Sequence, residues 1–385
     1  IDIDYSDGDL VDINDNHQIN SVVHNNSDRL LDYTATLGDI SVNSITSGNA
    51  AVTLTAAAGA IAEAATNTST NISTAGVLTL SAATGIGADG ADQALDTNVG
   101  TLAAQTTLSG GIYINQTGDL LVGVGDNGID GITAATGGSV GLESSGNVSL
   151  NSGSRVIAGG NGTSLAIDAG SINLNPGTAG TETIQNTGSG SIELTADAGD
   201  ITLDHHSIGT GSGTVTVDAG TGDILVAQSV GTSEINSTGT VTLSGAAIGS
   251  TNALEIDGAT ALEIFDNGTG AIQIAELSAD TITSTAITVG NVGFGTIDIV
   301  YNNDDLVDID DSHEINSVVH NNANRDFEYT ATSGDVRVNE VFGGSAAVTL
   351  TSLSGSIDET VSDTSINVTT DGTLTLSAST GIGSS

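Results

Sequence analysis

The 385-residue sequence contains no cysteine, methionine, tryptophan or lysine. The lack of cysteine excludes a disulfide scaffold and thiolate metal sites. Aromatic residues make up 2% of the chain, so the bulky side chains that fill a globular core are scarce. Hydrophobic residues nevertheless reach 37%, which argues against disorder. Valine, isoleucine, leucine and alanine remain plentiful, and we therefore expect a thin, ordered, elongated core.

Positive charge is nearly absent. Four basic residues, all arginine (Arg29, Arg155, Arg325 and Arg337), stand against 47 acidic residues, giving a net charge of −43. Acidic residues are about as frequent as in ordinary proteins, so the imbalance comes from missing basic residues. Nucleic acid and anionic membranes are excluded as electrostatic partners, because both require lysine or arginine. Divalent cations remain candidate partners, and mutual repulsion can keep a long surface soluble.

The first 89 residues return at the other end of the chain. Residues 1–89 align with residues 297–385 at a constant offset of 296, without insertions, and more than half of the aligned positions are identical. The differences lie mostly at polar or turn positions. The chain is therefore predicted to hold one module, residues 1–296, followed by the start of a second tandem module, residues 297–385.

A shorter periodicity runs inside the module. Apolar residues recur as pairs separated by one residue, the pattern of short β-strands, and glycine or aspartate-rich turns separate the pairs. Examples are Ile192/Leu194, Ile201/Leu203, Val215/Val217, Ile224/Val226 and Val241/Leu243. Every second or third strand start recurs after roughly 18 to 26 residues. The spacing predicts coils of two or three strands, each strand pairing in parallel with its equivalent in the next coil.

A β-sandwich would also fit strands of this length. Sandwiches need bulky cores and close after about 100 residues, whereas this pattern continues through the whole chain. We therefore predict an all-β fold, a parallel β-solenoid wound as a right-handed β-helix, without helices. No apolar run reaches the 18 residues of a membrane-spanning helix, so membrane insertion is not expected. We expect any targeting signal to lie outside these residues.

The strand pattern carries a family resemblance. The segments Gly76–Gly87 and Gly372–Gly383, and the Gly-Asp-Ile-x-Leu pattern at Gly199–Leu203, resemble the filamentous-haemagglutinin-like large exoproteins and other bacterial β-strand-repeat adhesins. The resemblance covers the whole chain and is one of overall strand pattern. It implies a right-handed parallel β-helix, an extracellular or cell-surface location, and a role in adhesion or matrix structure.

Two acidic turns form the candidate metal site. The alternating oxygen ligands of Asp12, Asn14 and Asn16 recur in the second copy at Asp308, Asp310 and Ser312, and calcium loops use this spacing because alternate oxygens can converge on a hard cation. The glycine and the distal glutamate of an EF-hand are missing. The turns thus predict calcium as the candidate cofactor, against the alternative of a plain turn.

Three further polar groups were weighed. His17 and His24 recur as His313 and His320; in one uninterrupted strand their odd spacing would place them on opposite faces, so shared metal ligation would require a bend. His205 and His206 are expected to alternate across a strand. Gly123–Asp130 resembles a single calcium-binding nonapeptide of the RTX type, although such sites form between stacked repeats.

These observations predict a structural protein, one segment of an extracellular fibre, matrix or adhesin stalk whose modules stack end to end. Its main partner would be itself, either through further tandem repeats or through another copy. The alternative is a calcium-dependent cell-surface adhesin. A polysaccharide-active β-helix enzyme is disfavoured, because four arginines and no lysine cannot assemble the basic and acidic cluster that such a site needs. We therefore expect no catalytic activity.

Overall fold

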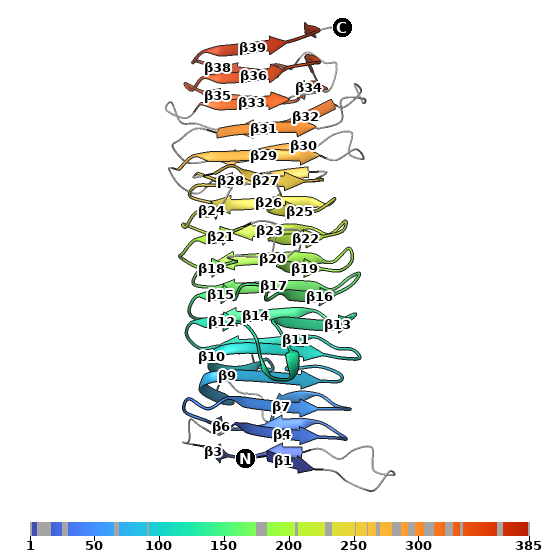
Figure 1. Cartoon of the computed structure of the whole chain (residues 1–385). Coiled ribbons are helices and arrows are strands. Elements are labelled where there is room, and N and C mark those ends of the chain that lie inside the picture. The colour runs from blue at the N-terminus through green and yellow to red at the C-terminus, as the bar shows by residue number, and fades with distance from the viewer. Residues whose placement is uncertain are drawn as a thin grey trace. The chain divides into compact units, whose positions relative to one another are not determined.

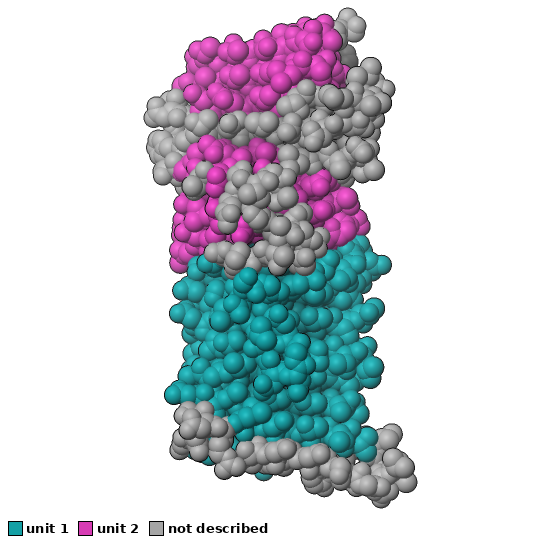
Figure 2. Space-filling model, in the orientation of Figure 1, with its two compact units in different colours: residues 1–193 teal, residues 194–385 magenta. Residues whose placement is uncertain are grey.

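The structure is a computed structural model, and it describes most of the chain. The described residues are 2–5, 17–24, 30–64, 69–90, 92–174, 183–204, 207–227, 233–250, 252–259, 261–266, 270–278, 286–291, 297–303, 312–319, 326–331, 334–359 and 365–383. They belong to two compact units, residues 1–193 and 194–385, coloured separately in Figure 2. The predicted module boundary follows residue 296, which lies outside the described residues, so that boundary stays a prediction.

Nearly every regular element is a short β-strand. The first unit contains β1 (Asp2–Tyr5), β2 (His17–Ile19), β3 (Val22–Val23), β4 (Leu31–Ala35), β5 (Ile40–Val42), β6 (Ile45–Thr46), β7 (Val52–Ala56), β8 (Ile61–Glu63), β9 (Ile72–Ala82), β10 (Leu95–Thr106), β11 (Ile112–Gln116), β12 (Leu120–Val122), the 3-10 turn η1 (Asp126–Gly128), β13 (Ile132–Thr136), β14 (Val140–Ser144), β15 (Val148–Leu150), β16 (Val156–Gly159), β17 (Ser164–Ala169), β18 (Ile172–Asn173) and β19 (Ile184–Asn186). β20 (Ser191–Ala196) includes the last residues of the first unit and the first of the second.

The second unit is built in the same way. It contains β21 (Ile201–Leu203), β22 (Ile208–Thr210), β23 (Val215–Asp218), β24 (Ile224–Val226), β25 (Ile235–Asn236), β26 (Thr240–Gly245), β27 (Leu254–Asp257), β28 (Ala261–Asp266), β29 (Ile272–Ser278), β30 (Ala286–Asn291), β31 (Ile297–Asn303), β32 (Ser312–Val319), β33 (Phe327–Ala331), β34 (Asp335–Val338), β35 (Val341–Gly344), β36 (Val348–Ser352), β37 (Ser356–Glu359), β38 (Val368–Thr370), β39 (Leu374–Ala378) and β40 (Gly381–Ile382). Apart from η1, no helix occurs among the described residues.

Each unit is a parallel β-solenoid, in which strands of successive coils lie one above another (Figure 1). Equivalent residues of the coils therefore form columns through the core. In the first unit one column runs through Ile40, Ile61, Ile86, Ile112 and Val140. Every member is at most 1% exposed. Neighbours in a column are one strand spacing apart, about 4.8 Å, so β-branched and leucine side chains fill the narrow interior without aromatic residues.

The second unit repeats this arrangement and confirms the predicted strand pattern. Its column Ile201, Ile224, Ile248 and Ile272 is fully buried. The strand predicted at Val215 pairs in parallel with β26, with Val215 beside Val241. Inward-facing apolar pairs separated by one residue thus form parallel ladders, and the predicted all-β solenoid is correct.

The coils are more variable in length than the sequence indicated. Leu95 lies beside Ile114, an offset of 19 residues, whereas Asp2 lies beside Asp32, an offset of 30. The predicted range of roughly 18 to 26 residues was too narrow at its upper end. Surplus residues enter loops outside the ladder, where added length disturbs no pairing.

One glycine shows how closely successive coils approach at the turns. Gly110 has φ of +81°, a left-handed conformation that favours glycine. A Cβ atom placed on it would lie 1.7 Å from the carbonyl oxygen of Thr84 in the preceding coil. No other residue fits this turn without moving the backbone of one coil.

The two sequence copies have the same strand register. In the first copy, Ile40 pairs with Ile61, Val52 with Leu78 and Ile61 with Ile86. Adding 296 to each number gives pairs that also occur in the second copy: Val336 with Ile357, Val348 with Leu374 and Ile357 with Ile382. Each copy therefore builds the same succession of coils, including positions whose residues differ.

Candidate functional site

The predicted calcium turns lie almost wholly outside the described residues. Asp12, Asn14, Asn16, Asp308 and Asp310 are among the residues that the structure does not describe. Ser312 is the first residue of β32. Calcium binding at these turns stays a prediction. Elsewhere, no group of three or more histidine or acidic side chains in the described ranges could hold a metal ion.

His17 and His24 both face the protein interior, at 8% and 6% exposure. The expectation that they lie on opposite faces was wrong, because β2 and β3 are separate strands interrupted at Asn20 and Ser21. The two imidazoles have different partners. Nδ1 of His17 is 2.9 Å from the hydroxyl of Tyr33, and Nδ1 of His24 is 3.3 Å from the hydroxyl of Ser47.

The remaining predicted histidines contribute no described site. His205, His206 and His320 lie outside the described residues, and His313 is placed only by its backbone, which pairs with Val336. The two described histidines, each bonded to a neighbouring strand, are interior hydrogen-bonding groups. They indicate packing of the coil rather than metal binding.

The RTX-like segment folds into a loop over the outside of the solenoid. Residues 123–131 leave the coil after β12, form η1, and return at β13, with an antiparallel bridge between Val124 and Asp130. Figure 1 shows this loop and its short helix crossing in front of the neighbouring strands. Gly125 lies so close to β9 and β10 that a Cβ atom on it would be 2.6 Å from both Ala103 Cβ and Thr79 Oγ1. We call residues 123–131 the strap.

Asp126 fastens the strap to two coils. Its backbone N–H donates to the hydroxyl of Thr79 at 2.9 Å, and its carboxylate accepts a hydrogen bond from the hydroxyl of Thr53 at 2.8 Å. Both threonines face outward yet are at most 1% exposed. Their equivalents in the second copy, Thr349 and Thr375, are half-buried and exposed. The strap therefore removes an outer threonine ladder from solvent.

Replacing Asp126 by alanine should loosen the strap. A hydrogen bond to a charged acceptor contributes ~1.5–3 kcal/mol, so amides of β7 and β9 should exchange roughly tenfold faster or more. Hydrogen exchange read by mass spectrometry measures this directly. Asp92→Ala, at an exposed aspartate of the same unit, is the matched control. Equal exchange in both variants would show that the strap does not hold these coils.

Three carboxylates gather on the second unit. Glu234 is fully buried and Asp204 is 1% exposed. Glu234 Oε2 accepts a hydrogen bond from the backbone N–H of Glu255 at 2.7 Å, while Oε1 is buried without a hydrogen-bond partner. Burial, helped by the charges of Glu255 and Asp204, raises the pKa of Glu234 to about 8. This carboxyl group is consequently protonated in the fold at neutral pH.

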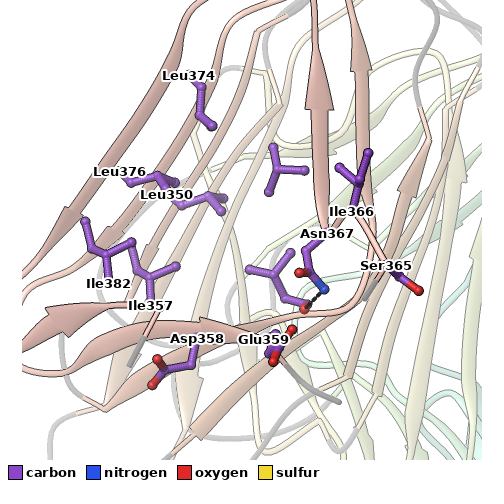
Figure 3. A pocket seen from close by; sticks show the side chains of 13 residues that line it. Leu350, Ile357, Asp358, Glu359, Ser365, Ile366, Asn367, Leu374, Leu376 and Ile382 are labelled. Atoms are coloured by element: carbon purple, nitrogen blue, oxygen red, sulfur yellow. Dashed lines mark hydrogen bonds between the residues drawn. The ribbon is translucent and has the colours of Figure 1, made fainter. Parts of the chain in front are cut away.

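The largest described hollow opens at the last coils of the second unit. It has a volume of about 490 Å³. Figure 3 shows its apolar side chains converging from β36, β37, β39 and β40, with Asp358, Glu359 and Asn367 on the opposite side. The core columns of the second unit face into this space. We call it the end hollow; its principal apolar residues are Leu350, Ile357, Val368, Leu374, Leu376 and Ile382.

Hydrogen bonds fix the polar edge of the end hollow. The Asn367 side chain donates to the carbonyl oxygens of Val338, at 3.1 Å, and Asn339, at 3.2 Å. The hydroxyl of Thr370 donates to the carbonyl of Ala346 at 2.5 Å and accepts from the N–H of Gly372 at 2.9 Å. The edge is thereby organised by contacts within its own unit.

Sequence reasoning found neither the strap contacts, the buried Glu234 nor the end hollow. The internal repeat was the one available signal for the last of these, since it identifies the surface that residues 338–383 copy. Among the described residues, no helix has the length and apolar character needed to cross a membrane. No family model, curated protein or solved structure matches the chain.

Proposed function

We propose that the protein is a structural segment of an extracellular stalk or fibre, built from tandem β-solenoid modules that stack in one register. The observation that supports this proposal is the shared register of residues 1–89 and 297–385. A pairing such as Val52 with Leu78 recurs as Val348 with Leu374. Sequence differences between the copies leave the ladder unchanged, as a repeating support requires.

The physical character of the solenoid also favours a supporting role. Every described ladder is a parallel array in which a coil contacts mainly the coils before and after it, so repeats add length rather than a new kind of core. The proposal includes no catalytic activity. The adhesin-like strand pattern supports a location at the cell surface, where the protein would carry a binding region away from the cell.

The charge of −43 would influence how such fibres associate. Exposed like charges repel, and salt screens them beyond ~10 Å at 0.1 M. In this proposal fibres stay separate at low ionic strength, and added salt or divalent cations permit lateral association. Calcium binding at the acidic turns would make the same stalk a calcium-dependent adhesin.

The proposal is tested by changing the number of modules. A chain carrying one additional copy of residues 1–296 ahead of the native 385 residues should be longer by on the order of 60 Å, from about 4.8 Å per coil. Negative-stain electron microscopy or small-angle scattering measures the maximum dimension. The native chain is the reference. A longer chain that folds to the same maximum dimension, with a larger cross-section, would contradict the proposal.

A further inference from the structure

The end hollow exposes side chains whose first-copy equivalents are buried. Leu374 is 44% exposed and Ile382 is 51% exposed, whereas Leu78 and Ile86, at the same positions of the first copy, are 0% exposed. The residue types are identical in the two copies. The difference therefore arises from what lies next to them.

In the first copy, the next coil covers these residues. Leu102 of β10 pairs with Leu78, and Ala104 pairs with Leu80. Ile112 forms a parallel bridge with Ile86. These three covering residues are themselves fully buried. The surface copied by the end hollow is thus a template for a strand segment with the sequence of residues 95–112.

A polar group gives this template its register. In the first copy, Asn71 Oδ1 accepts a hydrogen bond from the N–H of Asp96 at 2.9 Å, and the Asn71 N–H donates to the Asp96 carbonyl at 2.8 Å. The Asn71 side chain also donates to the Val42 carbonyl at 3.3 Å. Asn367 repeats this last bond, to Val338 at 3.1 Å, beside the end hollow (Figure 3). It is already held in the orientation that receives the next coil.

The amino-terminal strand of a second copy fits the hollow less well. The sequence of β1 recurs as β31, and β31 pairs with β29, with Ile272 beside Ile297. The partner known for this sequence is therefore the ladder Ile272–Ser278. The edge of the hollow is β39, Leu374–Ala378, which has a different sequence and, in the first copy, a β10-type neighbour.

We propose that the end hollow is a docking surface selective for a coil with the sequence of residues 90–116 of this same module, bound in parallel with Leu102 beside Leu374 and Ile112 beside Ile382. This inference rests on the proposed tandem stacking and specifies its junction. The recognising chemistry is an unpaired parallel strand edge, an apolar core surface, and the Asn367 amide that pairs with the backbone of the position equivalent to Asp96.

The test extends the chain. Residues 90–116 are added directly after Ser385, which preserves the 296-residue offset, and Leu374 is replaced by cysteine. Because the chain has no other cysteine, maleimide labelling reports Cys at this position alone. The extension should slow labelling roughly tenfold or more, as expected when a site reacts only after local opening. A scrambled 90–116 extension and an extension with residues 1–27 should leave labelling fast.

Leu353→Cys provides the matched control, since Leu353 is 59% exposed and its first-copy equivalent, Ala57, is exposed as well. Its labelling should be the same in every extended chain. Asn367→Ala should restore labelling at position 374 in the chain extended by residues 90–116. Three results would overturn the proposal: no protection by residues 90–116, equal protection by residues 1–27, or protection of the unextended chain that grows with its concentration. The maximum particle dimension is a separate readout, so failure at this junction is distinguishable from failure of tandem lengthening.

Discussion

Leu80→Ala should destabilise the first unit by ~2–5 kcal/mol, the usual loss when a buried leucine leaves a cavity. Leu80 is fully buried between the coils of β7 and β10. Leu376, the same residue in the second copy, is half-buried beside the end hollow. Leu376→Ala should therefore cost less than ~1 kcal/mol, because water already reaches this side chain.

Urea denaturation followed by circular dichroism measures both substitutions, and hydrogen exchange assigns each loss to its unit. Two transitions are to be expected if the units unfold separately, so each is fitted by itself. Leu353→Ala, at an exposed position, serves as the neutral control. Equal losses for Leu80→Ala and Leu376→Ala would show that the end hollow is closed in solution.

Glu234→Gln should make the second unit more stable at alkaline pH. The pKa of Glu234 is about 8 in the fold, raised from 4.5 mainly by burial. The folded state therefore holds a proton that the unfolded state releases. The stabilisation from this proton is fully present below pH 4.5 and is lost as the pH rises through 8, at ~1.4 kcal/mol per unit of pKa difference. Glutamine copies the protonated form and cannot lose it.

The measurement is the difference in melting temperature between the native chain and the variant from pH 4 to pH 9. The difference should be small near pH 4 and should increasingly favour Glu234→Gln toward pH 9. Glu193→Gln, at an exposed glutamate, tests whether any loss of acidic charge has this effect. A difference that is independent of pH, or one shared by Glu193→Gln, would contradict the buried, protonated state of Glu234.

The fold could be predicted because its signal is local and repeated. Val215 and Val217 point inward from one strand, and Val241 and Leu243 do so from the strand that pairs with it. Period-2 pairs separated by a coil's length of polar residues have few ways to bury their apolar side other than parallel stacking. The 296-residue repeat added independent support, because both copies had to satisfy the same arrangement.

The polar sites were beyond sequence reasoning because they depend on which coil lies beneath which loop. Asp126 bonds to Thr53, 73 residues earlier in the chain, and nothing near either residue encodes that distance. Glu234 precedes the apolar Ile235 in an ordinary strand pattern. Its high pKa follows from the pairing of Ile235 with Ile256, which places Glu255 alongside. His17 and His24 were misplaced because the interruption between β2 and β3 reverses the alternation of faces.

The shared register also has a genetic consequence. A residue in the first copy and the residue 296 positions later have the same neighbours in their ladders. Unequal crossing-over between two such genes, misaligned by one module, would join coils that already fit each other. The array could then gain or lose 296 residues without any new contact needing to evolve. A deletion of part of a module would instead bring strands such as β39 and β31 together, each deprived of its matching neighbour, so changes in length should occur in whole modules.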